Sequence, residues 1–152
     1  MKIAIVKLSA LGDIVHAMVV LQFIKKYNKE ITIDWVVEES YKELLDCNPD
    51  INKIHTVNIK KVKKKKSIYL LFSELSKVRN FGKYDLVIDM QGLIKSAFIS
   101  RLISSPITIG FDKSSSRESV ASFFYTKTFK SEYGDNVIVR NFQLIKFAIS
   151  RQ

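Results

Sequence analysis

Two kinds of segment alternate along this chain, and this alternation limits the possible folds more than any other feature. Short runs rich in β-branched residues are typical of buried strands. They lie at Lys2 to Val6, Ile31 to Val37, Lys53 to Ile59, Tyr84 to Met90 and Pro106 to Phe111. Strands that alternate with helices are joined by right-handed crossovers into a parallel sheet. We therefore predict an α/β fold, a doubly wound and mainly parallel sheet with helices on both faces.

Apolar residues at spacings of three and four predict the helices between these strands. The first runs from the region of Asp13 to Ile24, and either Asp13 or Ser9 could cap its start. The other five are predicted at Glu39 to Cys47, Ser67 to Gly82, Ile94 to Ser104, Glu118 to Tyr125 and Val137 to Ser150.

Length and composition suit one soluble domain. The chain has 152 residues, of which 47% are hydrophobic and 26% charged. Every apolar run is shorter than the roughly 18 residues that a membrane span needs, and the N-terminus is a poor signal peptide, so we expect a cytoplasmic protein. With a single cysteine and two histidines, the sequence predicts neither a disulfide framework nor a metal site.

The formal net charge of +10 favours an anionic partner. Nucleic acid, an anionic membrane surface and a phosphorylated small molecule are all compatible with it. Six lysines form one dense block: Lys60, Lys61, Lys63, Lys64, Lys65 and Lys66. This block is either a solvated loop or an anion-binding segment. Because it has no interleaved aromatic residues, we expect it to contact phosphates or sugar acids rather than nucleic acid.

A parallel sheet binds ligands at the carboxyl ends of its strands, and this rule selects the candidate site segments. They are Lys7 to Asp13, Glu38 and Glu39, Lys60 to Lys66, Asp89 to Lys95, and Asp112 to Arg117. Most of these segments are basic or contain glycine. A rim of this kind fits an anionic ligand.

The turn after the first strand, KLSALGD, contains a single glycine, Gly12, and so is neither a dinucleotide fingerprint nor a Walker loop. Gly12 could let a ligand approach the backbone closely. Asp13 is either a helix cap worth about 1 kcal/mol or a general base, and the two roles compete for the same oxygens. His16, one turn later, either faces the same cleft or is structural.

Two later turns offer anion contacts. Gln91, Gly92 and Lys95 follow the fourth strand near a helix start, where they form either a sugar-binding or anion-binding turn or an exposed one. Arg117 stands among serines, where its guanidinium could grip a carboxylate or phosphate. The alternative is a polar loop in which Ser116 caps a helix.

Taken together, four segments resemble the N-terminal half of the bacterial lipopolysaccharide heptosyltransferases of glycosyltransferase family 9, and heptosyltransferase I most closely. They are KLSALGDIVHAM (Lys7 to Met18), DWVVEESY (Asp34 to Tyr41), YDLVIDMQGLIKSA (Tyr84 to Ala97) and SRESVASFFY (Ser116 to Tyr125). The resemblance implies a GT-B enzyme with an acceptor-binding N-terminal domain and a donor-binding C-terminal domain, both Rossmann-like. Such enzymes transfer heptose from ADP-heptose to Kdo-lipid A with inversion, without a metal or other cofactor.

The resemblance also assigns site residues. It makes Asp13 the general base and Ser9, Gly12, Gln91, Gly92, Arg117 and Arg140 acceptor-site residues. It matches Lys60, Lys61, Lys63 and Lys64 to a basic segment that contacts the Kdo carboxylates and lipid A phosphates, although lysine lacks the bidentate fork of arginine. A family histidine near the last helix is replaced by Asn136, so its role is not carried over.

Family members are about twice as long as this chain, so we expect one acceptor-binding domain over residues 1–152 with the donor domain absent. Such a chain should not transfer sugar alone, and we expect it to contact the inner face of the cytoplasmic membrane peripherally. The alternative is a stand-alone, non-catalytic basic module that binds anionic lipid or nucleic acid.

Overall fold

The computed structural model describes residues 1–132 and 134–151 and contains one sheet of six parallel strands. The strands are β1 (Lys2–Val6), β2 (Thr32–Glu38), β3 (Lys53–Val57), β4 (Leu86–Asp89), β5 (Thr108–Phe111) and β6 (Lys127–Phe129). Their order is β3-β2-β1-β4-β5-β6. The chain starts in the middle of the sheet, builds one half outward and then returns to build the other. The predicted doubly wound α/β fold is therefore confirmed.

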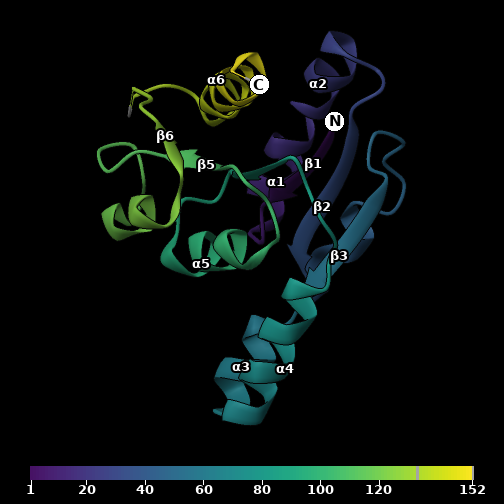
Figure 1. Ribbon diagram of the computed structural model, residues 1–152, viewed down its shortest axis with the longest axis vertical. Coiled ribbons are helices and arrows are strands. Elements are labelled where there is room, and N and C mark those ends of the chain that lie inside the picture. The colour runs from purple at the N-terminus through teal and green to yellow at the C-terminus, as the bar shows by residue number, and fades with distance from the viewer. Residues whose placement is uncertain (133, 152) are drawn as a thin grey trace.

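Helices cover both faces of this sheet (Figure 1). They are α1 (Leu11–Met18), α2 (Leu21–Tyr27), α3 (Ile59–Lys65), α4 (Ile68–Arg79), α5 (Ile94–Leu102) and α6 (Val137–Ser150), with 3₁₀ helices η1 (Glu39–Leu44) and η2 (Ser119–Phe124). None of the helices in the described residues is long and apolar enough to cross a membrane.

Alternate residues of the central strand supply the two cores, as the period of two in a strand requires. Ile3 and Ile5 pack with α1, α2 and α6 on one face. Ala4 and Val6 pack with the last turns of α4 and with α5 on the other. Both faces of β1 are thus buried, which explains why its sequence is a continuous apolar run.

The structure corrects several predicted elements. The first helix is two helices, because the Val20 N–H bonds to the Ala17 carbonyl at 3.2 Å and tightens the chain between α1 and α2. The predicted helices at Glu39 to Cys47 and Glu118 to Tyr125 are six-residue 3₁₀ helices. The edge strand β6 was not predicted, since its three residues are largely exposed and lack an apolar run.

The lysine block is a helix rather than a loop. The Glu38 carboxylate at the end of β2 accepts hydrogen bonds from the Ile59 and Lys60 N–H groups, at 3.3 and 3.2 Å. The Asn58 side chain accepts another from the Lys61 N–H at 3.0 Å. A carboxylate at a helix N-terminus offsets the helix dipole and satisfies free N–H groups. These contacts start α3, which packs along α4 in a hairpin that projects from the body of the molecule (Figure 1).

Candidate functional site

A polar cavity of about 290 Å³ lies at the carboxyl ends of β1, β4 and β5, beside the start of α6. Its lining consists of Lys7, Asp13, Met90, Gln91, Gly92, Phe111, Ser115, Ser116, Arg117, Val137, Arg140 and Asn141. Five of these, Asp13, Gln91, Gly92, Arg117 and Arg140, are predicted site residues. The strand-end rule therefore selected the edge of the sheet at which this cavity lies.

Neither Asp13 nor Ser9 is the N-cap residue of α1, although the Asp13 carboxylate contacts the backbone of the residue that is. The residue that precedes the helix is Ala10, and Asp13 stands three positions further on. One Asp13 carboxylate oxygen accepts the Ala10 N–H at 3.5 Å, a distance at the limit of a hydrogen bond. The half-buried carboxylate is thus only weakly engaged by its own helix, and it lines the cavity. Geometry leaves it accessible to a ligand.

Lys7 is the cation beside Asp13. Its side chain is 6% exposed, and its Nζ donates to the Met90 carbonyl at 3.3 Å. Burial lowers the pKa of Lys7, while the Asp13 and Asp89 carboxylates partly oppose that shift. The Lys7 ammonium is buried and therefore already has fewer water molecules around it than an exposed ammonium. It can pair with an anion that enters the cavity at a smaller cost of dehydration.

Asp89, at the end of β4, holds the Gln91–Gly92 turn that forms part of the cavity wall. It is completely buried, and one oxygen accepts the Gln91 and Gly92 N–H groups at 2.8 and 3.3 Å. The other oxygen accepts the Ser96 and Tyr125 hydroxyls at 2.9 and 2.7 Å. Burial raises the pKa of Asp89, and these hydrogen bonds oppose the shift. They also fix the turn in which Gly92 has φ +71°, a value that favours glycine.

The Gln91 side chain joins two of the predicted loops. Its carbonyl oxygen accepts the Leu8 and Ser9 N–H groups at 3.1 and 3.3 Å, and its amide donates to the Ser9 hydroxyl at 3.3 Å. Ser9 does not line the cavity, but it contacts Gln91, which does. Gly12 is exposed and does not line the cavity, and a Cβ there would meet nothing within 4 Å. Packing alone does not require glycine at this position.

Two arginines approach the cavity from the opposite side. The Arg140 guanidinium, on α6, lies 4.9 Å from the centre of the Phe111 ring and donates to the Ser115 carbonyl. Arg117 is exposed in the loop after β5. Lys7, Arg117 and Arg140 face a single cavity-lining acid, Asp13. The excess of positive charge suits an anionic ligand.

Other predicted residues have different surroundings. Ser116 does not cap η2, because Glu118 precedes that helix and the Ser116 hydroxyl donates to the Phe111 carbonyl at 3.0 Å. Asn136 caps α6 by accepting the Ile138 N–H at 2.9 Å. His16 is exposed on α1 and does not line the cavity.

The lysine block lies outside this cavity, on α3. The Lys60 ammonium donates to the Ser40 hydroxyl at 3.2 Å and lies 4.6 Å from the centre of the Tyr41 ring. Lys63 borders a separate open hollow of about 460 Å³ beside α5. Lys61 and Lys64 are exposed. The predicted acceptor-site residues therefore form two groups, one around the cavity and one on the hairpin.

Sequence reasoning missed Lys7 and Asn141 as individual cavity residues. Lys7 belongs to a candidate segment, and its position directly after β1 was the signal that could have selected it. Asn141 is 3% exposed and lies one residue after Arg140 on α6. The sequence of an amphipathic helix does not show which of its polar residues is buried. That depends on how the helix packs in the structure.

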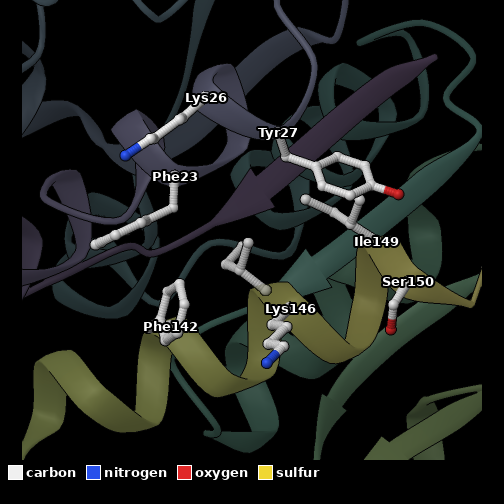
Figure 2. Close-up of a pocket in the computed structure, with 8 residues that line it drawn as sticks. Phe23, Lys26, Tyr27, Phe142, Lys146, Ile149 and Ser150 are labelled. Atoms are coloured by element: carbon white, nitrogen blue, oxygen red, sulfur yellow. The ribbon is translucent and has the colours of Figure 1, made fainter.

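A second cavity, of about 330 Å³, is apolar and lies between α2 and α6 (Figure 2). The rings of Phe23 and Phe142 meet there at 4.5 Å, and Tyr27 and Ile149 close the other end. No carboxylate, histidine or thiol is present in its lining. Its polar groups are those of Lys26, Tyr27, Lys146 and Ser150. Within residues 1–132 and 134–151, no three histidine, cysteine, aspartate or glutamate side chains are grouped as a metal site would require.

Comparison with known proteins identifies the family. Residues 74–150 match the family model of glycosyltransferase family 9 (heptosyltransferase). The chain belongs to this family. It is 43% identical over 151 residues to lipopolysaccharide heptosyltransferase 1 of Campylobacter coli, covering 99% of this chain and 42% of that protein. The Pseudomonas aeruginosa protein of the same name is 34% identical, with 98% of this chain and 43% of that protein covered.

Solved structures agree with this family 9 assignment. Escherichia coli heptosyltransferase WaaC with ADP-2-deoxy-2-fluoro heptose matches with a TM-score of 0.92 and 28% identity, over 99% of this chain and 49% of that one. The same enzyme with ADP gives a TM-score of 0.90. The chain spans less than half the length of the relatives it matches.

Proposed function

We propose that this chain is the acceptor-binding domain of a heptosyltransferase, of the type that transfers L-glycero-D-manno-heptose from ADP-heptose to Kdo-lipid A in lipopolysaccharide core synthesis. The observation that supports it best is the cavity in which Asp13 stands among Lys7, Arg117 and Arg140 in a family 9 chain. A sugar acid offers a carboxylate for the cations and a hydroxyl for the aspartate. The relatives named lipopolysaccharide heptosyltransferase 1 favour this acceptor class.

In the proposed reaction, Asp13 acts as the general base. Its carboxylate takes the proton from an acceptor hydroxyl while that oxygen attacks the anomeric carbon of the heptose. The new C–O bond forms as the bond to the ADP phosphate breaks, so ADP leaves with the electron pair and the anomeric centre is inverted. A positioned base of this kind contributes on the order of a hundredfold or more to the rate. The weak 3.5 Å contact with Ala10 leaves the carboxylate able to accept that proton.

The cations have a different role, which is to hold the acceptor. Arg117 is exposed and can pair with a carboxylate in bidentate fashion. Lys7 and Arg140 line the deeper wall. Gln91 and Gly92 supply part of the polar wall, and Ser9 supports it through its contact with Gln91. Gly12, at the start of α1, follows the loop of Ser9, and we propose that this segment contacts the acceptor outside the cavity. Lys60, Lys61, Lys63 and Lys64 on α3 would meet the lipid-linked phosphates further along the acceptor.

The donor contacts would come from a second α/β domain, and this chain would then not transfer sugar by itself. The two matched structures are of the longer WaaC protein with ADP and with an ADP-heptose analogue. Since a Kdo-lipid A acceptor is held in a bilayer by its acyl chains, we also place the protein at the inner face of the cytoplasmic membrane as a peripheral protein.

The test is calorimetric titration of the chain with a deacylated, soluble Kdo-containing acceptor. We expect saturable binding that Arg117→Gln weakens about tenfold, because a charge-assisted pair is lost. Arg101→Gln, an exposed arginine on α5 away from the cavity, is the matched control and should bind as the parent does. No saturable binding, or equal loss in both variants, would refute the acceptor assignment.

A test of Asp13 as the base requires a protein that also carries the donor domain, because the assay measures sugar transfer. There, Asp13→Ala should abolish transfer and leave acceptor affinity nearly unchanged. Near-normal turnover of the variant would exclude Asp13 as the base. Titration of the 152-residue chain with ADP-heptose should show no strong binding.

A further inference from the structure

Three strongly exposed apolar side chains gather near the tip of the α3–α4 hairpin. Ile68, Tyr69 and Phe72 are 71, 81 and 65% exposed, and they occupy adjacent positions on one side of the first turns of α4. Soluble proteins rarely leave a contiguous apolar patch of this kind without a partner. The patch is therefore a candidate interaction surface.

The fold explains why this patch is not part of the core. Within α4, only Val78, in the last turn, is fully buried. Leu71 and Leu75 of α4 border a groove toward α3 and α5. The first turns project with α3 beyond the end of the sheet (Figure 1). Ile68, Tyr69 and Phe72 therefore stay exposed, because this part of α4 does not reach the core.

Lysines surround the patch. The turn between the helices consists of Lys66, with φ +47°, and Ser67, whose hydroxyl accepts the Leu70 N–H at 3.3 Å and caps α4. Lys63, Lys64 and Lys65 directly precede this turn. These three lysines and Lys66 are exposed, and none of the four forms an ion pair with another described residue. The nearest acid on α4, Glu74, pairs with Lys77 instead, at 2.9 Å. The cations at the tip remain available to an external anion.

A second group of exposed apolar side chains lies on α5. Ile94 and Phe98 are 42 and 40% exposed, and together with Lys63, Lys95 and Glu118 they border the open hollow of about 460 Å³. Beside the hairpin, too, apolar side chains lie next to lysines.

We propose that the α3–α4 hairpin tip, defined as Lys65, Lys66, Ile68, Tyr69 and Phe72, docks this protein onto an anionic bilayer surface. Ile68, Tyr69 and Phe72 insert at the head-group level, and Lys65 and Lys66 lie against the lipid phosphates. Apolar and aromatic residues beside unpaired lysines are the combination that binds such an interface. The proposed function enters this inference only in the identity of the membrane, which would be the cytoplasmic membrane. Docking itself needs no acceptor.

Vesicle sedimentation tests the docking without acceptor. The chain should bind vesicles of mixed phosphatidylcholine and phosphatidylglycerol, more weakly at high salt, and bind phosphatidylcholine alone far less. Ile68→Ser/Tyr69→Ser/Phe72→Ser should lower binding to the mixed vesicles at least about tenfold, because the inserted apolar area is lost. Thermal unfolding should be unchanged, since all three side chains are exposed.

Matched controls distinguish binding by the hairpin tip from nonspecific binding through other exposed apolar or charged residues. Tyr27 is 69% exposed on α2, so Tyr27→Ser should bind as the parent does, whereas Tyr69→Ser should bind more weakly. Lys65→Gln/Lys66→Asn should weaken binding by up to about fivefold per lysine, and Lys127→Gln/Lys130→Gln, with the same charge change, much less. Equal effects in each matched pair, or parent-like binding by the triple variant, would overturn the docking surface.

Two further measurements separate this inference from the proposed function. The triple variant should still bind the soluble deacylated acceptor, which needs no bilayer. If the parent binds vesicles but not the soluble acceptor, the acceptor assignment fails and the docking surface stands. If the parent prefers RNA to mixed vesicles at equal salt and the triple variant loses RNA binding, the tip is a nucleic-acid surface and the docking proposal fails.

Discussion

Replacing Tyr125 with Phe removes a single oxygen atom, and we predict that this weakens both the fold and the candidate site. The Tyr125 hydroxyl donates to Asp89 at 2.7 Å, and Asp89 is completely buried. The ring itself can stay in place, since Phe has the same shape. The change therefore isolates one hydrogen bond to a buried carboxyl group.

The expected loss in the free energy of unfolding is that of this one hydrogen bond. Hydrogen bonds to charged groups are worth about 1.5–3 kcal/mol, and a buried acceptor that loses a donor has no water to replace it. Ser96 still donates to the same oxygen, at 2.9 Å, so we expect the low to middle part of that range. For a domain of this size, the corresponding fall in Tm is about 3–9 °C.

The cost should also depend on pH. Burial already raises the pKa of Asp89, and loss of the Tyr125 hydroxyl removes a group that opposes the rise. A carboxyl group whose folded-state pKa is raised binds its proton more tightly in the folded state, so stability falls as pH rises through that pKa. The destabilisation by Tyr125→Phe should therefore be larger at pH 7.5 than in mild acid.

Urea denaturation of the chain at both pH values measures the effect. Tyr69→Phe is the matched control, because that side chain is 81% exposed, and it should change the free energy of unfolding by less than about 0.5 kcal/mol. A Tyr125→Phe variant as stable as this control at both pH values would refute the reasoning. Because Asp89 holds the Gln91–Gly92 turn, the variant should also bind the soluble acceptor more weakly.

Three other predictions concern different parts of the molecule. Gly110→Ala should cost about 1–3 kcal/mol in urea denaturation, because its Cβ would overlap the Tyr125 ring, and Tyr125→Ala should suppress that cost. Burial chiefly lowers the pKa of His55, so stability should fall as pH drops below about 6.5, and His55→Gln should remove that part of the pH dependence. Lys7→Met should leave the free energy of unfolding unchanged or raise it, since a buried ammonium is costly except where an anion pairs with it. The same variant should bind the acceptor about tenfold more weakly. A parent-like affinity would contradict the role given to Lys7.

Local pattern predicted most of the fold. The bounds of α6 agree with the predicted helix at Val137 to Ser150, and β1 agrees with Lys2 to Val6. Both segments carry a full period of apolar residues, and burial of that face is what makes the element form. The 3₁₀ helices and the edge strand β6 carry no comparable period, because few of their side chains enter the core.

The resemblance to family 9, and the strand-end rule, also led to the cavity. Asp13, Arg117 and Arg140 are far apart in sequence but follow or face neighbouring strand ends. The parallel sheet brings the ends of its strands together, so the alternation of strands and helices was enough to select the segments of Asp13 and Arg117. Arg140, on α6, came only from the resemblance.

Long-range contacts decided what the sequence left open. The lysine block is helical because Glu38, 21 residues before Ile59, caps its start. The Gln91 amide holds the Leu8 backbone 83 residues away, and Lys7 becomes a buried cation only when β4 passes beside it. Hydrophobic period is a local property of the chain and determined the layers of this protein; burial, capping and charge pairing are set by partners distant in sequence, and only the tertiary structure could specify them.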